Sequence, residues 1–262
     1  MRIELNGEQV FYSSGSGSPG EQAQTVIFLH GAGFDHSIWV MPARYFARHG
    51  WRVAAVDLPG HGRSTGSLLT SIEQMADWVA QLIDAISPNH CATLVGHSMG
   101  SLIAMSAAAR HADKVTKLAL LGTSAPMPVS DVLLNAAKDN DQAAIAMTNV
   151  WSHSAKGRLG SSENPGLSNL NVGQRLLQQA GRDVLFTDLA ACNSFRVDGL
   201  PPIQQPALVI IGTDDKMTPP RAGLAVANRL TDVQQLQLSG CGHSMLSEKP
   251  NDVLDALAQF LN

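Results

Sequence analysis

Six short apolar segments, separated by stretches with helical periodicity, constrain the fold of this chain more than any other feature. Most of them are rich in Val, Ile, Leu and Ala, which is typical of strands buried on both faces. Strands that alternate with helices form βαβ units, in which the strands run parallel and the helices cover both faces of the sheet. The sequence therefore predicts an α/β protein with a mostly parallel, doubly wound sheet. The segments are TVIFLH, WRVAAVDL, ATLVG, KLALLG, PALVIIG and VQQLQLSG, with helical patterns at about 37–47, 71–86, 99–110, 219–230 and 251–261.

Two parts of the chain depart from this alternation. The N-terminal segments RIEL and QVFYS alternate in polarity and are joined by NGE, which predicts a β-hairpin. Between residues 125 and 197 no segment has a strand pattern: VLLNAAKDNDQAAIAMTNVW and VGQRLLQQA favour helices, and SHSAKGRLGSSENPGLSNLN favours a loop. We therefore expect a core formed by residues 1–124 and 198–262, and a helical cap formed by residues 125–197.

Composition excludes several functional classes. The chain has 262 residues, 44% of them hydrophobic and 15% charged, with a net charge of −4 and no run of basic residues, which argues against nucleic-acid binding. No apolar run approaches the roughly 18 residues of a membrane span, and the N-terminus does not have the pattern of a signal peptide. The three cysteines form no CxxC pair, so neither a disulfide framework nor a zinc site is expected. These features favour a cytoplasmic protein without membrane contact; none indicates an oligomeric state.

The segment GHSMG, residues 96–100, marks a candidate nucleophile. It fits the pattern G-x-S-x-G and lies directly between a predicted strand and a predicted helix, as that motif requires. A sharp turn there would project the hydroxyl of Ser98 above the sheet, and small residues are expected at Gly96 and Gly100 because they crowd each other across the turn. The following helix adds amide groups that can stabilise an oxyanion. An ordinary tight turn is the alternative interpretation.

A serine nucleophile needs a base, and the base needs a carboxylate to orient it. Of nine histidines, His243 follows the last predicted strand, where a loop can bring it over the sheet edge toward Ser98. His97 is expected to point away from Ser98 and to pack against or orient the turn. Two candidate acids, Asp214 and Asp215, follow the strand PALVIIG. The chain order serine, aspartate, histidine agrees with that of the nucleophile-elbow enzymes.

Taken together, these motifs resemble those of the α/β-hydrolase fold superfamily, in its serine-esterase branch with a helical cap. The resemblance covers nearly the whole chain and is strongest in HGAGFDHSIW, VDLPGHGRS, GHSMGS, GTDDKMTP and GCGHSMLSEKP. In relatives the acid is the last aspartate of G-x-x-D-x-x-x-P, which implies Asp215 and leaves Asp214 second. The resemblance also implies an oxyanion hole formed by the amides of Ala32 and Met99.

Several side chains are expected near the substrate. Gly31 and Gly33 allow the sharp turn that aims amides at a carbonyl oxygen. Phe34 is expected in the acyl pocket, whereas Trp39 is expected in the core. Asp57 and Arg63 are interpreted as a structural pair or cap, and His153 as a minor candidate for facing the site. Met99 and Met245 are expected to form an apolar wall beside the nucleophile and the base. Three residues of the cap are expected either to complete an apolar substrate chamber or to form the core of the cap itself: Met127, Met147 and Trp151.

The resulting hypothesis is a carboxylesterase that hydrolyses a small-molecule ester of a small to medium apolar acyl group through an acyl-enzyme. Ser98, Asp215 and His243 would be catalytic, with no cofactor and no metal. The scattered histidines His30, His36 and His61 do not have ligand-like spacing. Lactonase, amidase, perhydrolase and carbon–carbon bond hydrolase activities remain alternatives. The last is less favoured because GHSMLSE has no tryptophan after His243. A ligand-sensing protein that has retained the triad is the non-enzymatic alternative.

Overall fold

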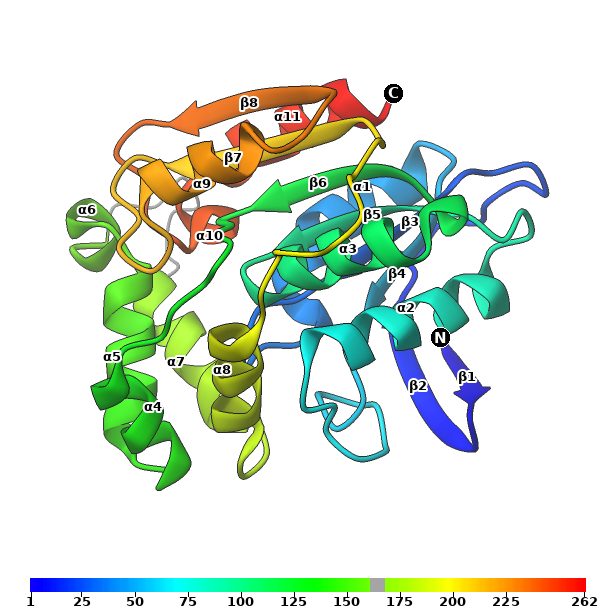
Figure 1. Ribbon diagram of the computed structural model, residues 1–262. Helices are drawn as coiled ribbons and strands as arrows, with labels where there is room; N and C mark the ends of the chain where they lie inside the picture. Colours follow the sequence, from blue (N-terminus) through cyan, green and yellow to red (C-terminus); the bar gives the residue numbers. More distant parts are fainter. Residues whose placement is uncertain (161–167) are drawn as a thin grey trace.

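An eight-stranded, mostly parallel sheet runs through the protein (Figure 1), as the sequence predicts. The computed structural model describes residues 1–160 and 168–262. The strand order is β1-β2-β4-β3-β5-β6-β7-β8; the pairs β1–β2 and β2–β4 are antiparallel, and the other pairs are parallel. The strands are β1 (Arg2–Leu5), β2 (Glu8–Ser13), β3 (Thr25–Leu29), β4 (Arg52–Val56), β5 (Ala92–His97), β6 (Val115–Leu121), β7 (Ala207–Gly212) and β8 (Val233–Leu238).

Helices on both faces bury the sheet, which explains why its central strands are apolar throughout. In β3, Ile27 and Leu29 belong to one core cluster, while Val26 and Phe28 belong to the other, because successive side chains point to opposite faces. The first cluster includes side chains of α2 (Ile72–Ile86), α3 (Met99–Arg110) and α9 (Pro220–Ala227). The second includes side chains of α1 (Val40–Arg48) and α11 (Pro250–Leu261). The loops at the carboxyl ends of β3, β5, β7 and β8 therefore have a rigid support.

Among the described residues, five helices lie between β6 and β7, and most of them gather together away from the sheet in Figure 1. The segment expected to be a loop contains the short helix α6, which Ser154 caps by accepting a hydrogen bond from the amide of Gly157, and the start of α7. Residues 161–167 of that segment lie outside the described part. The division of the chain at residues 125 and 197 stays a prediction. The helices are α4 (Asp131–Lys138), α5 (Gln142–Ser152), α6 (Ala155–Arg158), α7 (Asn169–Gln179) and α8 (Val184–Ser194).

Smaller differences from the expected elements occur at helix ends. The helix expected from residue 37 is divided into η1 (His36–Trp39), which the Asp35 side chain caps, and α1. Two short elements, η2 (Ala112–Lys114) and α10 (Met245–Glu248), complete the fold. Trp39 is fully buried in the core, as expected. Among the described residues, no helix is long and apolar enough to cross a membrane.

Candidate active site

Ser98 lies at the sharp turn between β5 and α3, with a backbone conformation that residues other than glycine rarely adopt. Its φ is 55° and its ψ is −119°, and its amide donates a 2.9 Å hydrogen bond to the carbonyl of Leu121 at the end of β6. A Cβ on Gly96 would overlap the carbonyl oxygen of Gly100, while one on Gly100 would overlap that of Leu29. The two glycines are therefore required for different reasons: only Gly96 is crowded across the turn, and Gly100 is pressed against β3. A strained backbone at such a turn is typical of functional sites.

His243 and Asp215 form a buried pair at the carboxyl ends of β7 and β8. Nδ1 of His243 lies 2.8 Å from Oδ2 of Asp215, and both residues are about 4% exposed. Burial alone would raise the pKa of Asp215, but the charge and hydrogen bond of His243, with the hydrogen bonds of Thr218, outweigh burial and lower this pKa. Asp214 is exposed and makes its side-chain hydrogen bond with neighbouring Thr213. Of the two candidate acids, only Asp215 contacts His243.

Two contacts bring the His243 loop to the Ser98 turn. The imidazole of His97 donates from Nε2 to the carbonyl of His243 at 2.9 Å, and the two rings are 4.8 Å apart between centroids. A Cβ on Gly122, directly after the Leu121 carbonyl that Ser98 contacts, would lie 3.0 Å from the His243 ring. Burial, followed by the neighbouring His243, lowers the pKa of His97 to about 3, so this ring stays neutral. His97 thus supports the loop of His243, whereas the sequence indicated only packing or orientation of the turn.

The loop after β3 lies against Ser98. A Cβ on Gly31 would be 3.2 Å from Cβ of Ser98, and Ala32 lines the same cavity as Ser98. Gly33 has a φ of 72°, so a side chain at this position would strain the backbone, and its Cβ would come within 2.9 Å of a methyl group of Leu177. Met99, the first residue of α3, is fully buried. These positions put both expected oxyanion amides on segments that flank Ser98.

A cavity of about 190 Å³ lies at Ser98, between the core and the helices α4, α5 and α8. Trp151 and Met127 line it, as expected for a substrate chamber. Most of its other walls are apolar, and one side chain, that of Lys216, is charged. The lining residues are Ala32, Ser98, Met127, Pro128, Val129, Ser130, Leu133, Trp151, Leu189, Cys192, Lys216, Met217 and Thr218.

Two residues expected at the substrate lie elsewhere. Phe34 lines a second, separate cavity of about 420 Å³, together with His153. Met245 is fully buried in the core under α11 and lines neither cavity. The interpretation of Phe34 as an acyl-pocket residue and of Met245 as a pocket wall therefore has no support from their positions. Met245 follows His243 by two residues, but the α10 helix directs it into the core.

Similarity to known proteins shows the family of this chain. Residues 24–250 match the family model described as "alpha/beta hydrolase fold". The chain belongs to the α/β-hydrolase fold family. Among curated relatives, a pimeloyl-[acyl-carrier protein] methyl ester esterase of Chromobacterium violaceum is 30% identical, over 92% of this chain and 95% of its own length. An (E)-2-((N-methylformamido)methylene)succinate hydrolase of Acinetobacter baylyi is 24% identical, over 100% of this chain and 97% of its own length.

Solved structures extend the similarity to the whole fold of this α/β-hydrolase. The enol-lactonase from Burkholderia xenovorans superposes with a TM-score of 0.86 at 23% identity, covering 100% of this chain and 99% of that one. At that identity the likeness concerns the fold alone. These two curated relatives are hydrolases, so the hydrolase class is shared, while their substrates differ from one another.

Asp188, a buried carboxylate on α8 of this α/β-hydrolase, belongs to none of the motifs in the sequence. Its Oδ2 accepts hydrogen bonds from the amide of Gly33 at 2.8 Å and from Nε2 of His61 at 2.9 Å. Burial alone would lower the pKa of His61, but the charge and hydrogen bond of Asp188 outweigh burial and raise it. No local motif marks Asp188, since its partners are 155 and 127 residues away in the chain. Only packing of α8 onto the core brings them together.

Thr218 was not predicted from the sequence either, and it contacts both members of the buried pair. Its hydroxyl donates to Oδ2 of Asp215 at 2.7 Å and lies 3.2 Å from Nδ1 of His243; its amide donates to Oδ1 of Asp215. The available signal was its position directly before Pro219 in the G-x-x-D-x-x-x-P pattern. The three hydrogen bonds from Thr218 and Met217 fix the Asp215 carboxylate toward His243.

Replacing Thr218 by valine is expected to lower kcat/KM by about 10- to 100-fold. The change removes one hydrogen bond to an ionised carboxylate, worth about 1.5–3 kcal/mol, while the similar volume leaves the backbone donors in place. Steady-state kinetics with an ester substrate measure the effect. Thr218→Ser keeps the hydroxyl and should retain most of the activity; equal losses in both variants would contradict a role for the hydroxyl.

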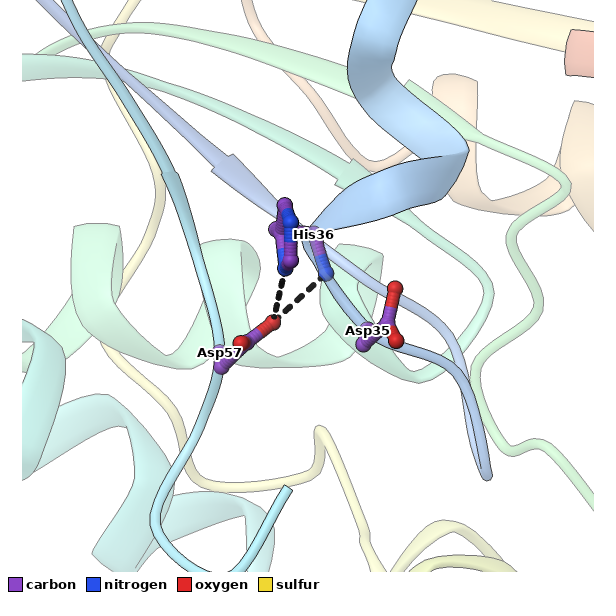
Figure 2. Close-up of side chains that lie close together, drawn as sticks. All are labelled: Asp35, His36 and Asp57. Carbon is purple, nitrogen blue, oxygen red and sulfur yellow. Dashed lines mark hydrogen bonds and ion pairs between the residues drawn. The ribbon is translucent and has the colours of Figure 1, made fainter. Parts of the chain in front are cut away.

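A cluster of Asp35, His36 and Asp57 brings possible metal-ligand atoms within 4.8 Å of one another (Figure 2). Oδ1 of Asp57 already accepts from the amide and from Nδ1 of His36, at 2.7 and 2.8 Å, and its Oδ2 accepts from the amide of Arg63. Asp35 accepts from the amide of Ser37. Loop stabilisation accounts for each of these contacts. Arg63 does not pair with Asp57 through its guanidinium, which instead lies 4.8 Å from the centre of the Phe11 ring.

Proposed function

We propose that this α/β-hydrolase cleaves carboxylic esters with a small to medium apolar acyl group, through an acyl-enzyme on Ser98. The observation that carries this proposal is the buried Asp215–His243 pair, which two contacts bring to the strained turn of Ser98. A hydroxyl at such a turn becomes an effective nucleophile when a base removes its proton during attack. Similarity to a methyl ester esterase that covers nearly the whole chain supports the reaction class.

In the proposed mechanism, each group has one task. Asp215 accepts from Nδ1 of His243, which leaves Nε2 to take the proton of Ser98 as its oxygen forms a bond to the ester carbonyl carbon. The amides of Ala32 and Met99 stabilise the negative oxygen of the tetrahedral intermediate. His243 then gives the proton to the leaving alcohol. Water, deprotonated by His243, attacks the acyl-enzyme and releases the acid, and the proton returns to Ser98.

The cavity at Ser98 sets the proposed size and polarity of the acyl group. Its volume of about 190 Å³ is small for a ligand pocket, for which about 300–1,000 Å³ is typical. Met127, Leu133, Trp151 and Leu189 provide apolar contacts. These features favour short acyl chains over long lipids, and the mechanism needs no cofactor. Lactones and carbon–carbon substrates remain alternatives on the same residues.

A panel of p-nitrophenyl esters with acyl chains of increasing length tests this function. We expect the highest kcat/KM for short to medium chains and a decline for long ones. Lactones and vinylogous ketones in the same panel distinguish the alternatives. If the protein reacts with a fluorophosphonate probe but hydrolyses none of these compounds, the esterase proposal is wrong, and a ligand-sensing role takes its place.

The positive charge of Lys216 is expected to favour esters whose acyl chain ends in a negative group. Among the described residues that line the Ser98 cavity, Lys216 is the charged one and none is a carboxylate. A monoester whose acyl chain ends in a free carboxylate is expected to have a higher kcat/KM than the ester whose chain ends in a primary amide. Because Lys216 is exposed, its attraction is worth at most about 1 kcal/mol, so we expect Lys216→Met to reduce the preference by about two- to fivefold. Lys216→Arg should keep it; an unchanged ratio in the methionine variant would contradict the prediction.

A further inference from the structure

Asp188 connects the cap helix α8 to the loop that carries a proposed oxyanion amide. Its carboxylate is fully buried, and Oδ2 holds the amide of Gly33, the residue after Ala32, on one side and His61 on the other. Gly33 belongs to the loop after β3, and His61 to the loop after β4. One side chain from the cap therefore joins two loops of the core.

The contact to Gly33 restrains the backbone at the position where catalysis needs it. The turn from Gly31 to Phe34 is closed by a 3.2 Å hydrogen bond from the amide of Phe34 to the carbonyl of Gly31. Gly33 adopts a positive φ, and because glycine has no Cβ, its backbone could adopt many other conformations if nothing restrained it. With its amide held by Asp188, the peptide that follows Ala32 is fixed in one orientation. An oxyanion donor is effective only when it lies about 2.7–3.1 Å from the developing charge, so a small rotation of this loop removes its effect.

The same helix contacts the cavity in which the acyl group would lie. Leu189 and Cys192, on α8, line the Ser98 cavity next to Ala32. Packing of α8 on the core thus completes the cavity wall and brings the Asp188 carboxylate to Gly33. Burial of a carboxylate is costly, and in the docked arrangement the contacts of Oδ2 with Gly33 and His61 offset part of that cost, while Oδ1 has no hydrogen-bond partner among the described residues.

We infer that Asp188 is a positioning residue, which makes the oxyanion hole complete only when the cap helix α8 is docked on the core. It does not touch the substrate; it acts through Gly33 and the neighbouring amide of Ala32. This inference rests on the proposed roles of Ser98 and Ala32. It gives the cap a part in catalysis itself, in addition to the shape of the substrate chamber.

The variants Asp188→Ala and Asp188→Asn separate positioning from simple structural support. Alanine removes the acceptor of the Gly33 amide, and we expect kcat to fall about 10²-fold, the lower end of the effect of losing one oxyanion donor, with little change in KM. Asparagine can place its Oδ1 where Oδ2 of Asp188 lies, where it accepts from the amide of Gly33 and from Nε2 of His61, while its Nδ2 takes the position of the other carboxylate oxygen, which has no hydrogen-bond partner among the described residues. Asparagine should therefore restore kcat to within about fivefold. Asp183→Ala, an exposed acid at the start of the same helix, is the matched control.

Two measurements test the inference without knowledge of the substrate. The rate of Ser98 labelling by a fluorophosphonate should fall in parallel with kcat for alanine and recover for asparagine, because the phosphonyl oxygen uses the same amides. Hydrogen exchange of the peptide that contains Gly33 should be faster in the alanine variant and close to that of the unchanged protein in the asparagine variant. A failed ester panel with these effects intact would reject only the proposed substrate.

The inference is overturned if folded Asp188→Ala labels and turns over at the rate of the unchanged protein. It is also overturned if the asparagine variant loses as much activity as the alanine variant. If the alanine variant does not fold, Asp188→Glu replaces it: the carboxylate is then kept but displaced in a packed site. If the fluorophosphonate labels Asp188→Glu slowly and Asp188→Asn at nearly the normal rate, the positioning role of Asp188 is supported. Equal labelling rates for these two variants reject that role.

Discussion

Replacing Ser98 by alanine is expected to reduce ester hydrolysis on the order of 10⁶-fold. The change removes the atom that forms the covalent bond, while the Asp215–His243 pair and the oxyanion amides stay in place. Steady-state kinetics on the best ester of the panel measure it, and residual hydrolysis reflects binding and the oxyanion hole alone. The backbone at residue 98 is strained, and alanine, like serine, adopts this conformation only at a cost in free energy. The thermal stability of Ser98→Ala should therefore be measured in parallel.

Labelling by a fluorophosphonate gives an independent result for the same variant. Labelling should disappear in Ser98→Ala and persist in Ser106→Ala, a matched control on α3 whose hydroxyl is buried without a hydrogen-bond partner among the described residues. Persistent labelling of Ser98→Ala would show that another residue is the nucleophile.

A large loss is also expected from Asp215→Asn, which should lower kcat by about 10⁴-fold. Asparagine fits the same space but offers no negative charge to an imidazolium, and its amide donors favour the tautomer of His243 that cannot take the proton of Ser98. The loss is a property of the transition state, so KM should change little. Because the pKa of Asp215 is lowered by His243 and Thr218, the carboxylate is ionised throughout the neutral pH range, where these rates are compared.

Asp214→Asn is the matched control for this prediction. Asp214 is adjacent in the chain, carries the same charge and is exposed, and it contacts Thr213 rather than His243. We expect its kcat to stay within about twofold of the unchanged protein, as for surface substitutions that touch no buried group. A larger loss for Asp214→Asn than for Asp215→Asn would exchange the two assignments.

The fold could be predicted from the sequence because its signals are local. Apolar strands buried on both faces, helical periodicity between them and glycine-controlled turns each extend over fewer than twenty residues, and each agrees with the others. The strand-to-helix turn at Ser98 is the clearest case: Gly96 is a steric requirement of the turn itself, whereas Gly100 is required because the start of α3 is pressed against the end of β3. Asp215 and His243 follow strands of one parallel sheet, so the edge at which they meet was fixed as soon as the strands were identified.

The sequence by itself thus determined the sheet, the turn at Ser98 and the loops that carry Asp215 and His243, because backbone geometry specifies them over short spans. Only the tertiary structure decided which side chains surround them. Asp188 reaches Gly33 across 155 residues, Phe34 lines a separate cavity and Met245 lies in the core. The direction of a side chain on a helix or loop depends on how that element packs against distant ones, and such contacts leave no periodic trace in the sequence.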